Sequence, residues 1–158
     1  MIKQNQLATD LVGAKTLKTD DRIELLGQLD ESSCFIMDFC HSISDQELKL
    51  KLKNIVRVLS MAMAEIAGAG QRLGEEHLKE LLEIVDQYNQ KAGSFNGFLL
   101  PGETPIGAKA HVVRTVIRRT ERAYAKVYDV YGGSKIIFEY LNKLSSLFFA
   151  IAKYYDEK

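Results

Sequence analysis

The sequence predicts an all-α fold, a five-helix up-and-down bundle in one domain spanning residues 1–158. Two observations support this. Apolar residues recur with helical periodicity from Asp20 almost to the C-terminus, and the glycines and prolines that interrupt helices fall in a few short segments. A chain of 158 residues can bury a core without disulfides or metal. Residues 1–18 lack this periodicity and any strand-like alternation, so we expect an irregular N-terminal segment.

The first two helices are bounded by recognisable signals. The first is expected over residues 21–43. Ser44 then stands where an N-cap is needed, and Glu47 three residues later completes a capping box for the second helix. This helix continues to Gly68, where two glycines in three residues end it.

The last three helices are bounded in the same way. The third is expected over residues 75–91, and a loop rich in glycine follows it. Thr104 and Pro105 form an N-cap and N1 pair that opens the fourth helix. Two glycines from Gly132 end it, and Ser134 can cap the fifth helix, which runs to near the C-terminus.

Composition excludes several classes of function. Lys plus Arg (21) equal Asp plus Glu (21), so no overall field would attract nucleic acid or an anionic membrane. The longest apolar run, 147–152, is far shorter than the ~20 residues of a spanning helix. The N-terminus does not resemble a signal peptide. Cys34 and Cys40 face different directions on one helix and match no metal or redox motif, so we expect two buried cysteines, no metal site and a cytoplasmic protein.

The fourth helix carries an unusual polar face. One broad face is apolar and is expected to pack inward; it comprises Val112, Val113, Val116, Ile117, Ala123, Tyr124, Val127, Tyr128 and Tyr131. The opposite stripe comprises His111, Arg114, Thr115, Arg118, Glu121 and Arg122. It could be an ordinary solvated face. Arginines at i, i+4 and i+8 repel one another, however, and their forked donors suit phosphate or carboxylate.

Two other helices break their patterns. Asp30 falls within the apolar arc of the first helix, where a carboxylate is costly unless a cation meets it. It could lie at the edge of the arc and reach solvent, or meet an arginine of the fourth helix, within the chain or across a subunit interface. Phe138 and Phe149 flank the polar side of the fifth helix. They indicate either a second contact surface or isolated exposed residues.

Three segments carry a family resemblance. They are Phe98–Gly102 (FLLPG), His111–Arg122 (HVVRTVIRRTER) and Tyr140–Ser145 (YLNKLS). They resemble F-x-L-P-G, H-x-x-R-T-x-x-R-R-x-E-R and Y-L-N-R/K-L-S, the signature of the propanediol-utilisation type of ATP:cob(I)alamin adenosyltransferase. Upstream, Lys18–Asp21 and Glu24–Glu31 resemble the stretch that leads into V-D-E-L. The resemblance extends from about Thr9 to Lys153.

The resemblance implies an activity and a site. In this family Co(I) of cobalamin attacks the 5′ carbon of ATP, and triphosphate leaves. ATP, Mg²⁺ and cobalamin are therefore expected, and the anionic leaving group requires preorganised cations. Arg118 and Phe98 are the implied catalytic residues, Phe98 because it would press on the lower face of the corrin and displace its axial base. The residues implied to bind ATP are Lys18, Arg118, Glu121, Arg122 and Asn142.

The resemblance also implies partners. Asp30 and Arg114 would form a salt bridge between subunits of a homotrimer, with a corrinoid reductase and a B12-dependent acceptor enzyme as further partners. The family's threonine- and glycine-rich ATP loop would fall at or before residues 1–7, which contain no glycine. Glu103 and Ser146 also depart from the family pattern. The alternatives are therefore a divergent, non-catalytic homologue that binds corrinoid or nucleotide as a chaperone or regulator, and a helical interaction module.

Overall fold

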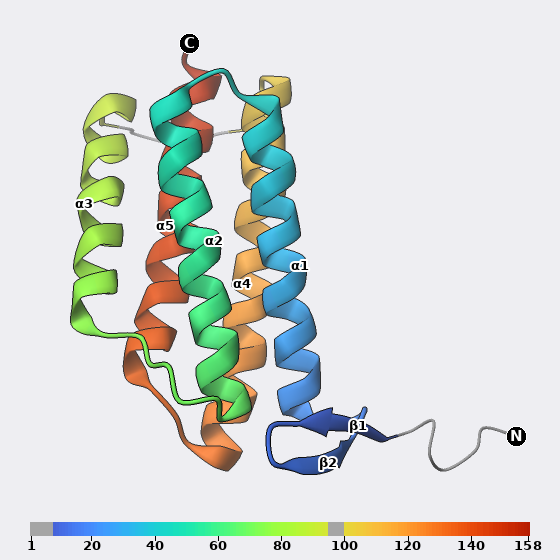
Figure 1. The fold of residues 1–158 in the computed structure, drawn as a ribbon. Coiled ribbons are helices and arrows are strands. Elements are labelled where there is room, and N and C mark those ends of the chain that lie inside the picture. The colour runs from blue at the N-terminus through green and yellow to red at the C-terminus, as the bar shows by residue number, and fades with distance from the viewer. Residues whose placement is uncertain (1–7, 95–99) are drawn as a thin grey trace, which may run out of the picture.

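In the part of the chain that the structure describes, five helices run antiparallel and a short β-hairpin precedes them. The computed structural model describes residues 8–94 and 100–158 (Figure 1). Its helices are α1 (Asp21–Ser42), α2 (Gln46–Ala67), α3 (Glu75–Ala92), α4 (Pro105–Tyr131) and α5 (Lys135–Asp156). Consecutive helices run in opposite directions, which confirms the predicted five-helix up-and-down bundle. None of the helices in the described part of the chain is long and apolar enough to cross a membrane.

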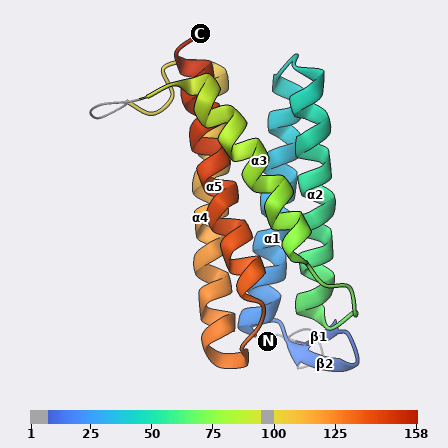
Figure 2. The same cartoon turned by 90° about the vertical axis from the view of Figure 1, so that its left-hand side faces the viewer.

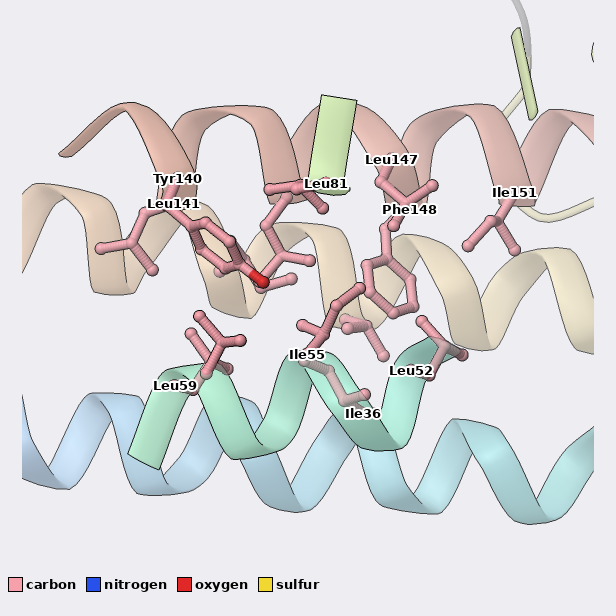
Figure 3. Packing of buried hydrophobic residues seen from close by; sticks show 14 of the residues in the cluster. Ile36, Leu52, Ile55, Leu59, Leu81, Tyr140, Leu141, Leu147, Phe148 and Ile151 are labelled. Atoms are coloured by element: carbon pink, nitrogen blue, oxygen red, sulfur yellow. The ribbon is translucent and has the colours of Figure 1, made fainter. Parts of the chain in front are cut away.

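The helix α4 lies between α1 and α5 and packs against both. The α3 helix packs on α5, and the α2 helix packs on α1 (Figure 2). Because α4 contacts both α1 and α5, it joins these two pairs of helices. Side chains of α1, α2, α4 and α5 meet in one hydrophobic cluster. In Figure 3, Phe148 and Tyr140 of α5 point towards the apolar residues of α2. The Phe148 ring also meets Phe39 of α1 edge to face, with centroids 5.5 Å apart.

A β-hairpin precedes α1, and the sequence analysis did not predict it. Strand β1 (Ala8–Leu11) pairs antiparallel with β2 (Ala14–Leu17), and Ala8 lies opposite Leu17. The irregular segment predicted for residues 1–18 is therefore wrong for residues 8–17. Gly13 turns the chain between the strands with φ = 81°, a conformation that glycine adopts without strain. The hairpin lies across the end of the bundle where α1 begins (Figure 1).

Most predicted helix ends are confirmed. The Thr104 hydroxyl accepts from Gly107 N at 3.0 Å, the Ser134 hydroxyl caps α5, and Gly68 ends α2 with φ = 88°. The N-cap predicted for α2 is wrong. The cap is Asp45, whose carboxylate accepts from Leu48 N at 3.0 Å, rather than Ser44. A carboxylate one residue later in the sequence serves the helix N-terminus at least as well as a hydroxyl.

The two cysteines differ in their surroundings. Both are free, as predicted, but only Cys40 is buried, and Cys34 is exposed. The neighbouring Ile36 lies within the core and Phe35 packs against it, so the inward face of α1 is next to Cys34 but does not include it. The prediction that both cysteines fill the core is therefore wrong for Cys34.

Candidate functional site

The polar stripe of α4 lies along the outer side of the helix. We use the name arginine stripe for His111, Arg114, Thr115, Arg118, Glu121 and Arg122. Thr115, Arg118 and Arg122 are exposed, whereas the other three are half-buried. The opposite face of α4 is buried mostly as predicted, at Val113, Val116, Ile117, Tyr124 and Val127. Val112 and Tyr131 were assigned to the inward face, but they are 47% and 51% exposed.

At one end of the stripe, Arg114 is held by its own helix. Its Nε donates to His111 Nδ1 at 3.1 Å, so that nitrogen of the imidazole carries no proton. Burial, and then the nearby Arg114, lower the pKa of His111 and keep the ring neutral. Burial, followed by the charge of Arg118, also lowers the pKa of Arg114. The His111 ring meets Phe149 of α5, with centroids 6.1 Å apart.

In the middle of the stripe, α4 and α5 share a hydrogen bond. Asn142 Nδ2 donates to Glu121 Oε1 at 3.0 Å. Two residues that the sequence analysis assigned to ATP binding thus lie together, although they are 21 positions apart in the chain. Asn142 is exposed and Glu121 half-buried, so both can reach a ligand on the outer face. The bond orients the Asn142 amide with its carbonyl oxygen free to accept.

Two stripe arginines are available to an anion. Arg118 and Arg122 have no hydrogen-bond or ion-pair partner within residues 8–94 and 100–158. Arg122 also lines a cleft of about 320 Å³ between α1 and α4, together with Arg119 and Lys126 of α4 and Asp21 and Glu24 of α1. Unpaired guanidinium groups with forked donors suit a polyphosphate better than an isolated carboxylate.

The sequence analysis assigned no role to Arg119. Its Nε donates to Gln28 Oε1 at 3.0 Å, and its Nη2 pairs with Glu31. Arg119 thus fixes the side of α4 that faces α1, next to the stripe. The helical wheel placed Arg119 outside the stripe, but its partners could not be predicted because they depend on which helix packs against α4.

Other predicted site residues are not brought to the stripe within this chain. Lys18 is exposed in the turn between β2 and α1 and makes no described contact with Arg118. Its neighbour Asp20 contacts Tyr131, which lies 13 residues after Arg118, about 20 Å along the helix. Phe98 lies outside the described residues. Two positions beyond Leu100, Gly102 has φ = 85°, and a Cβ there would lie 2.9 Å from that of Ala108.

The predicted salt bridge between Asp30 and Arg114 does not form within one chain. Asp30 is exposed and has no partner among the residues that the structure describes. In a single chain Asp30 therefore reaches solvent, which is one of the two possibilities left open by the sequence.

A larger cleft lies away from the stripe. It has a volume of about 700 Å³ and is bounded by the α2–α3 connection, the end of α4 and the start of α5. Its lining includes Arg72, Tyr124 and Gly133 but none of the arginine stripe. The volume alone does not identify it as the site, since its lining contains none of the residues that the family resemblance assigns to ATP.

Comparison with known proteins identifies the family of the chain. Residues 5–155 match the family model described as cobalamin adenosyltransferase. The chain belongs to the cobalamin adenosyltransferase family. It is 31% identical over 153 residues to a corrinoid adenosyltransferase of Bacillus subtilis (strain 168), covering 92% of this chain and 79% of that protein. It is 30% identical to one of Mycobacterium leprae (strain TN), covering 89% and 81%.

The fold of this family member is also found in solved structures. A PduO-type ATP:corrinoid adenosyltransferase of Lactobacillus reuteri, a phenylalanine variant complexed with cobalamin and ATP, superposes with a TM-score of 0.89. It shares 25% identity, and the match covers 97% of this chain and 90% of that one. An arginine-to-lysine variant complexed with ATP matches with the same TM-score and 26% identity.

The described residues contain no group of three or more His, Cys, Asp or Glu side chains that could hold a metal ion. Mg²⁺ generally binds through one or two carboxylates together with substrate phosphates. Glu121 is the carboxylate of the arginine stripe, and it lies between the unpaired Arg118 and Arg122. The residues present therefore fit a magnesium ion that arrives with a nucleotide, held mainly by phosphate oxygens.

Proposed function

We propose that this cobalamin adenosyltransferase family member transfers the 5′-deoxyadenosyl group of ATP to the Co(I) of cobalamin. A bond forms between cobalt and the 5′ carbon, and the bond between that carbon and the triphosphate oxygen breaks. The electron pair of this bond leaves with inorganic triphosphate. One observation carries the proposal: Arg118 and Arg122 are exposed on one helix face beside the bonded Glu121 and Asn142, and neither has a partner among the residues that the structure describes.

Each residue has a part in the proposed mechanism. Arg118 and Arg122 stabilise the negative charge that grows on the triphosphate as it leaves, because their charges are already in place. Asn142 offers an acceptor or a donor to the nucleotide, and Glu121 orients it. A magnesium ion bound with ATP would be held mainly by phosphate oxygens, with Glu121 as the nearby carboxylate, and would neutralise phosphate charge. Lys18 lies away from the stripe within one chain, so it would add its charge across a contact with a neighbouring subunit, and Phe98 would exclude an axial ligand from the lower face of the corrin.

The active form in this proposal is a homotrimer. Asp30 is exposed without a partner in the described chain, and Arg114 is half-buried and bonded to His111, so both have capacity for an ion pair with a neighbouring subunit. Val112 and Phe149, which are 47% and 44% exposed, supply apolar surface close to His111. A corrinoid reductase would supply Co(I), and a B12-dependent enzyme would accept the product.

A second candidate is a family member that binds corrinoid or nucleotide without transferring the adenosyl group. It is favoured by residues 1–7, where the family's threonine- and glycine-rich loop would fall and where no glycine occurs. Without the backbone amides of this loop to hold phosphate, ATP binding would be weakened more than corrinoid binding.

The deciding experiment follows the absorbance of cob(I)alamin under strong reductant before and after ATP and Mg²⁺ are added. The transferase converts the cob(I)alamin spectrum into that of adenosylcobalamin, and omission of ATP is the control. A binding protein shows ATP or corrinoid affinity without this conversion. If neither spectrum nor affinity responds to ATP or cobalamin, the proposed function is wrong.

A further inference from the structure

Two hydroxyl groups meet inside the interface between α1 and α4. Ser32 and Thr120 are both fully buried, and their oxygens lie 2.7 Å apart. Thr120 Oγ1 also lies 3.1 Å from the main-chain oxygens of Gln28 on α1 and Val116 on α4. Carbonyl oxygens only accept, so Thr120 donates to a carbonyl while Ser32 donates to Thr120. We call these two residues the hydroxyl pair.

The hydroxyl pair is an unusual choice for this position. The buried side chains on either side of it, Leu29 and Ile36 on α1 and Ile117 on α4, are apolar. A hydrogen bond between neutral groups adds little net stability, whereas a buried hydroxyl without a partner is costly. The bond to Val116 O lies within α4 and survives any alignment, whereas the contacts of Thr120 with Ser32 and Gln28 O form only in the observed one. These contacts therefore favour this register.

Gln28 extends the connection to the surface. Its side-chain oxygen accepts from Arg119 Nε at 3.0 Å, while its main-chain oxygen accepts from the neighbouring Thr120 at 3.1 Å. One turn of α1 is thus joined to one turn of α4 by two sets of hydrogen bonds: the buried bonds of Thr120 and the exposed bond between Arg119 and Gln28. The exposed bonds contribute little alone because water competes for them. The buried set therefore determines the alignment.

The same turns carry the predicted site. Thr120 stands between Arg119 and Glu121, with Arg118 and Arg122 two residues away on either side. A shift of one residue in the α1–α4 packing would rotate α4 by about 100° and turn both arginines to another face. Smaller shifts would move their guanidinium groups relative to Asn142 on α5 and would strain the bond between Asn142 and Glu121.

We propose that Thr120 and Ser32 are positioning residues, which hold the arginine stripe in the orientation that receives ATP. The inference rests on the proposed function, since the ligand it serves is the triphosphate of ATP. Neither hydroxyl touches ATP; both act through the placement of Arg118 and Arg122.

The test compares two substitutions of one residue. Thr120→Val keeps the shape of the side chain and removes the hydroxyl, whereas Thr120→Ser keeps the hydroxyl and removes a methyl group. Thr120→Val is expected to raise the KM for ATP roughly tenfold, because a small displacement of a binding group is costly. The KM for cobalamin should stay within about twofold in the same variant. Thr120→Ser should retain the KM for ATP of the unsubstituted protein.

Ile55→Val is the matched control. Ile55 is buried on α2, away from the α1–α4 interface, and its loss of a methylene loosens the core without touching the hydroxyl pair. Thermal unfolding shows whether its loss of stability is similar to that of Thr120→Val. A rise in the KM for ATP confined to Thr120→Val supports positioning. An equal rise in Ile55→Val would overturn it, because general loosening would then suffice.

The outcomes separate the inference from the proposed function. If the unsubstituted protein shows no ATP-dependent conversion or ATP affinity, both are refuted. If it is active and Thr120→Val leaves the KM for ATP unchanged, only the positioning role is wrong. Should Thr120→Val fail to fold, Ser32→Ala decides. It removes the donor to Thr120 but leaves the Thr120 bonds to carbonyls, so a smaller rise in the KM for ATP supports the role and no rise overturns it.

Discussion

The guanidinium of Arg22 lies over the ring of Tyr131, with its central carbon 4.2 Å from the ring centroid. Both side chains also bond to Asp20: Arg22 Nη2 lies 2.9 Å from Oδ2, and the Tyr131 hydroxyl donates to Oδ2 at 3.1 Å. Thr16 of β2 donates to the same oxygen. One carboxylate thus joins the hairpin, the start of α1 and the end of α4. This explains why Tyr131 points outward from the apolar face of α4.

We expect Asp20→Ala to destabilise the protein more than Asp20→Asn. Asp20 is the N-cap of α1 and accepts from Arg22 N at 2.8 Å. Asparagine keeps an oxygen for this bond, whereas alanine removes it, so the two free energies of unfolding should differ by about 1 kcal/mol. Urea denaturation measures the difference. Asp129→Ala, at an exposed position of α4, is the control and should leave stability nearly unchanged. Equal stability of both Asp20 variants would contradict the cap.

The stability contributed by the Asp20 charge should disappear in acid. Hydrogen bonds from the Arg22 side chain and backbone hold the pKa of Asp20 well below its usual range. A carboxyl with a lowered folded-state pKa stabilises the fold fully above its unfolded value, about pH 4, and loses this contribution as the pH falls towards the folded value. Thermal midpoints of the unsubstituted protein and Asp20→Asn should therefore converge below about pH 3. A difference that stays constant from neutral pH to acid would refute this.

The helices could be predicted because their signals are local. Apolar periodicity, the Thr104 and Ser134 caps and Gly68 all act within one or two turns, and the structure places each as expected. The hairpin lacked such a signal. Its strands are four residues long, and in β2 no side chain is buried, so no alternation marks them. The hairpin is held by the pairing of its two strands and by the bond from Thr16 to Asp20. Neither interaction can be recognised in the sequence.

The candidate site was predictable in part for the same reason. A helical wheel placed Arg114, Arg118 and Arg122 on one face, and the structure confirms that face as polar. The Glu121–Asn142 bond and the role of Arg119 depend on which helices pack against α4. The hydroxyl pair could not be found from periodicity either, because serine and threonine within an apolar arc give no sign of what they meet.

Tyr124→Phe should destabilise the protein without affecting ATP use. The Tyr124 hydroxyl accepts from Ser134 N and donates to Ser134 O, both at 2.9 Å, and so closes the α4–α5 connection. Loss of the hydroxyl removes both bonds from the half-buried Ser134 backbone, at a cost of about 1 kcal/mol in the free energy of unfolding.

Urea denaturation measures the Tyr124 effect, and Tyr128→Phe is the matched control. Tyr128 is half-buried one turn later on the same helix, and its hydroxyl has no hydrogen bond to the residues that the structure describes. Its substitution should change stability little. Similar losses in both variants would show that the bonds to Ser134 do not matter.

Arg118→Ala should reduce kcat/KM for adenosyl transfer by about 100-fold or more, since it removes a preorganised charge from the leaving group. Arg118→Lys keeps the charge but loses the forked pair of donors, so its kcat/KM should lie between those of Arg118→Ala and the unsubstituted protein. Initial rates of adenosylcobalamin formation give the comparison. Arg57→Ala, an exposed arginine on α2, is the control and should retain full activity. Unchanged rates in Arg118→Ala would remove Arg118 from the phosphate site.

Asp30→Ala should weaken the oligomer and lower activity together. The side chain is exposed on the surface of α1 and has no partner within the described chain, so its loss should leave the stability of the single chain unchanged. If Asp30 instead pairs with Arg114 of a neighbouring subunit, removing it leaves a half-buried cation without its counter-ion, and the equilibrium shifts towards monomer. Sedimentation velocity at several concentrations measures this shift, with Asp86→Ala on the exposed side of α3 as the control. An Asp30→Ala protein that sediments as the unsubstituted one does would exclude the interface role, whatever happens to its rate.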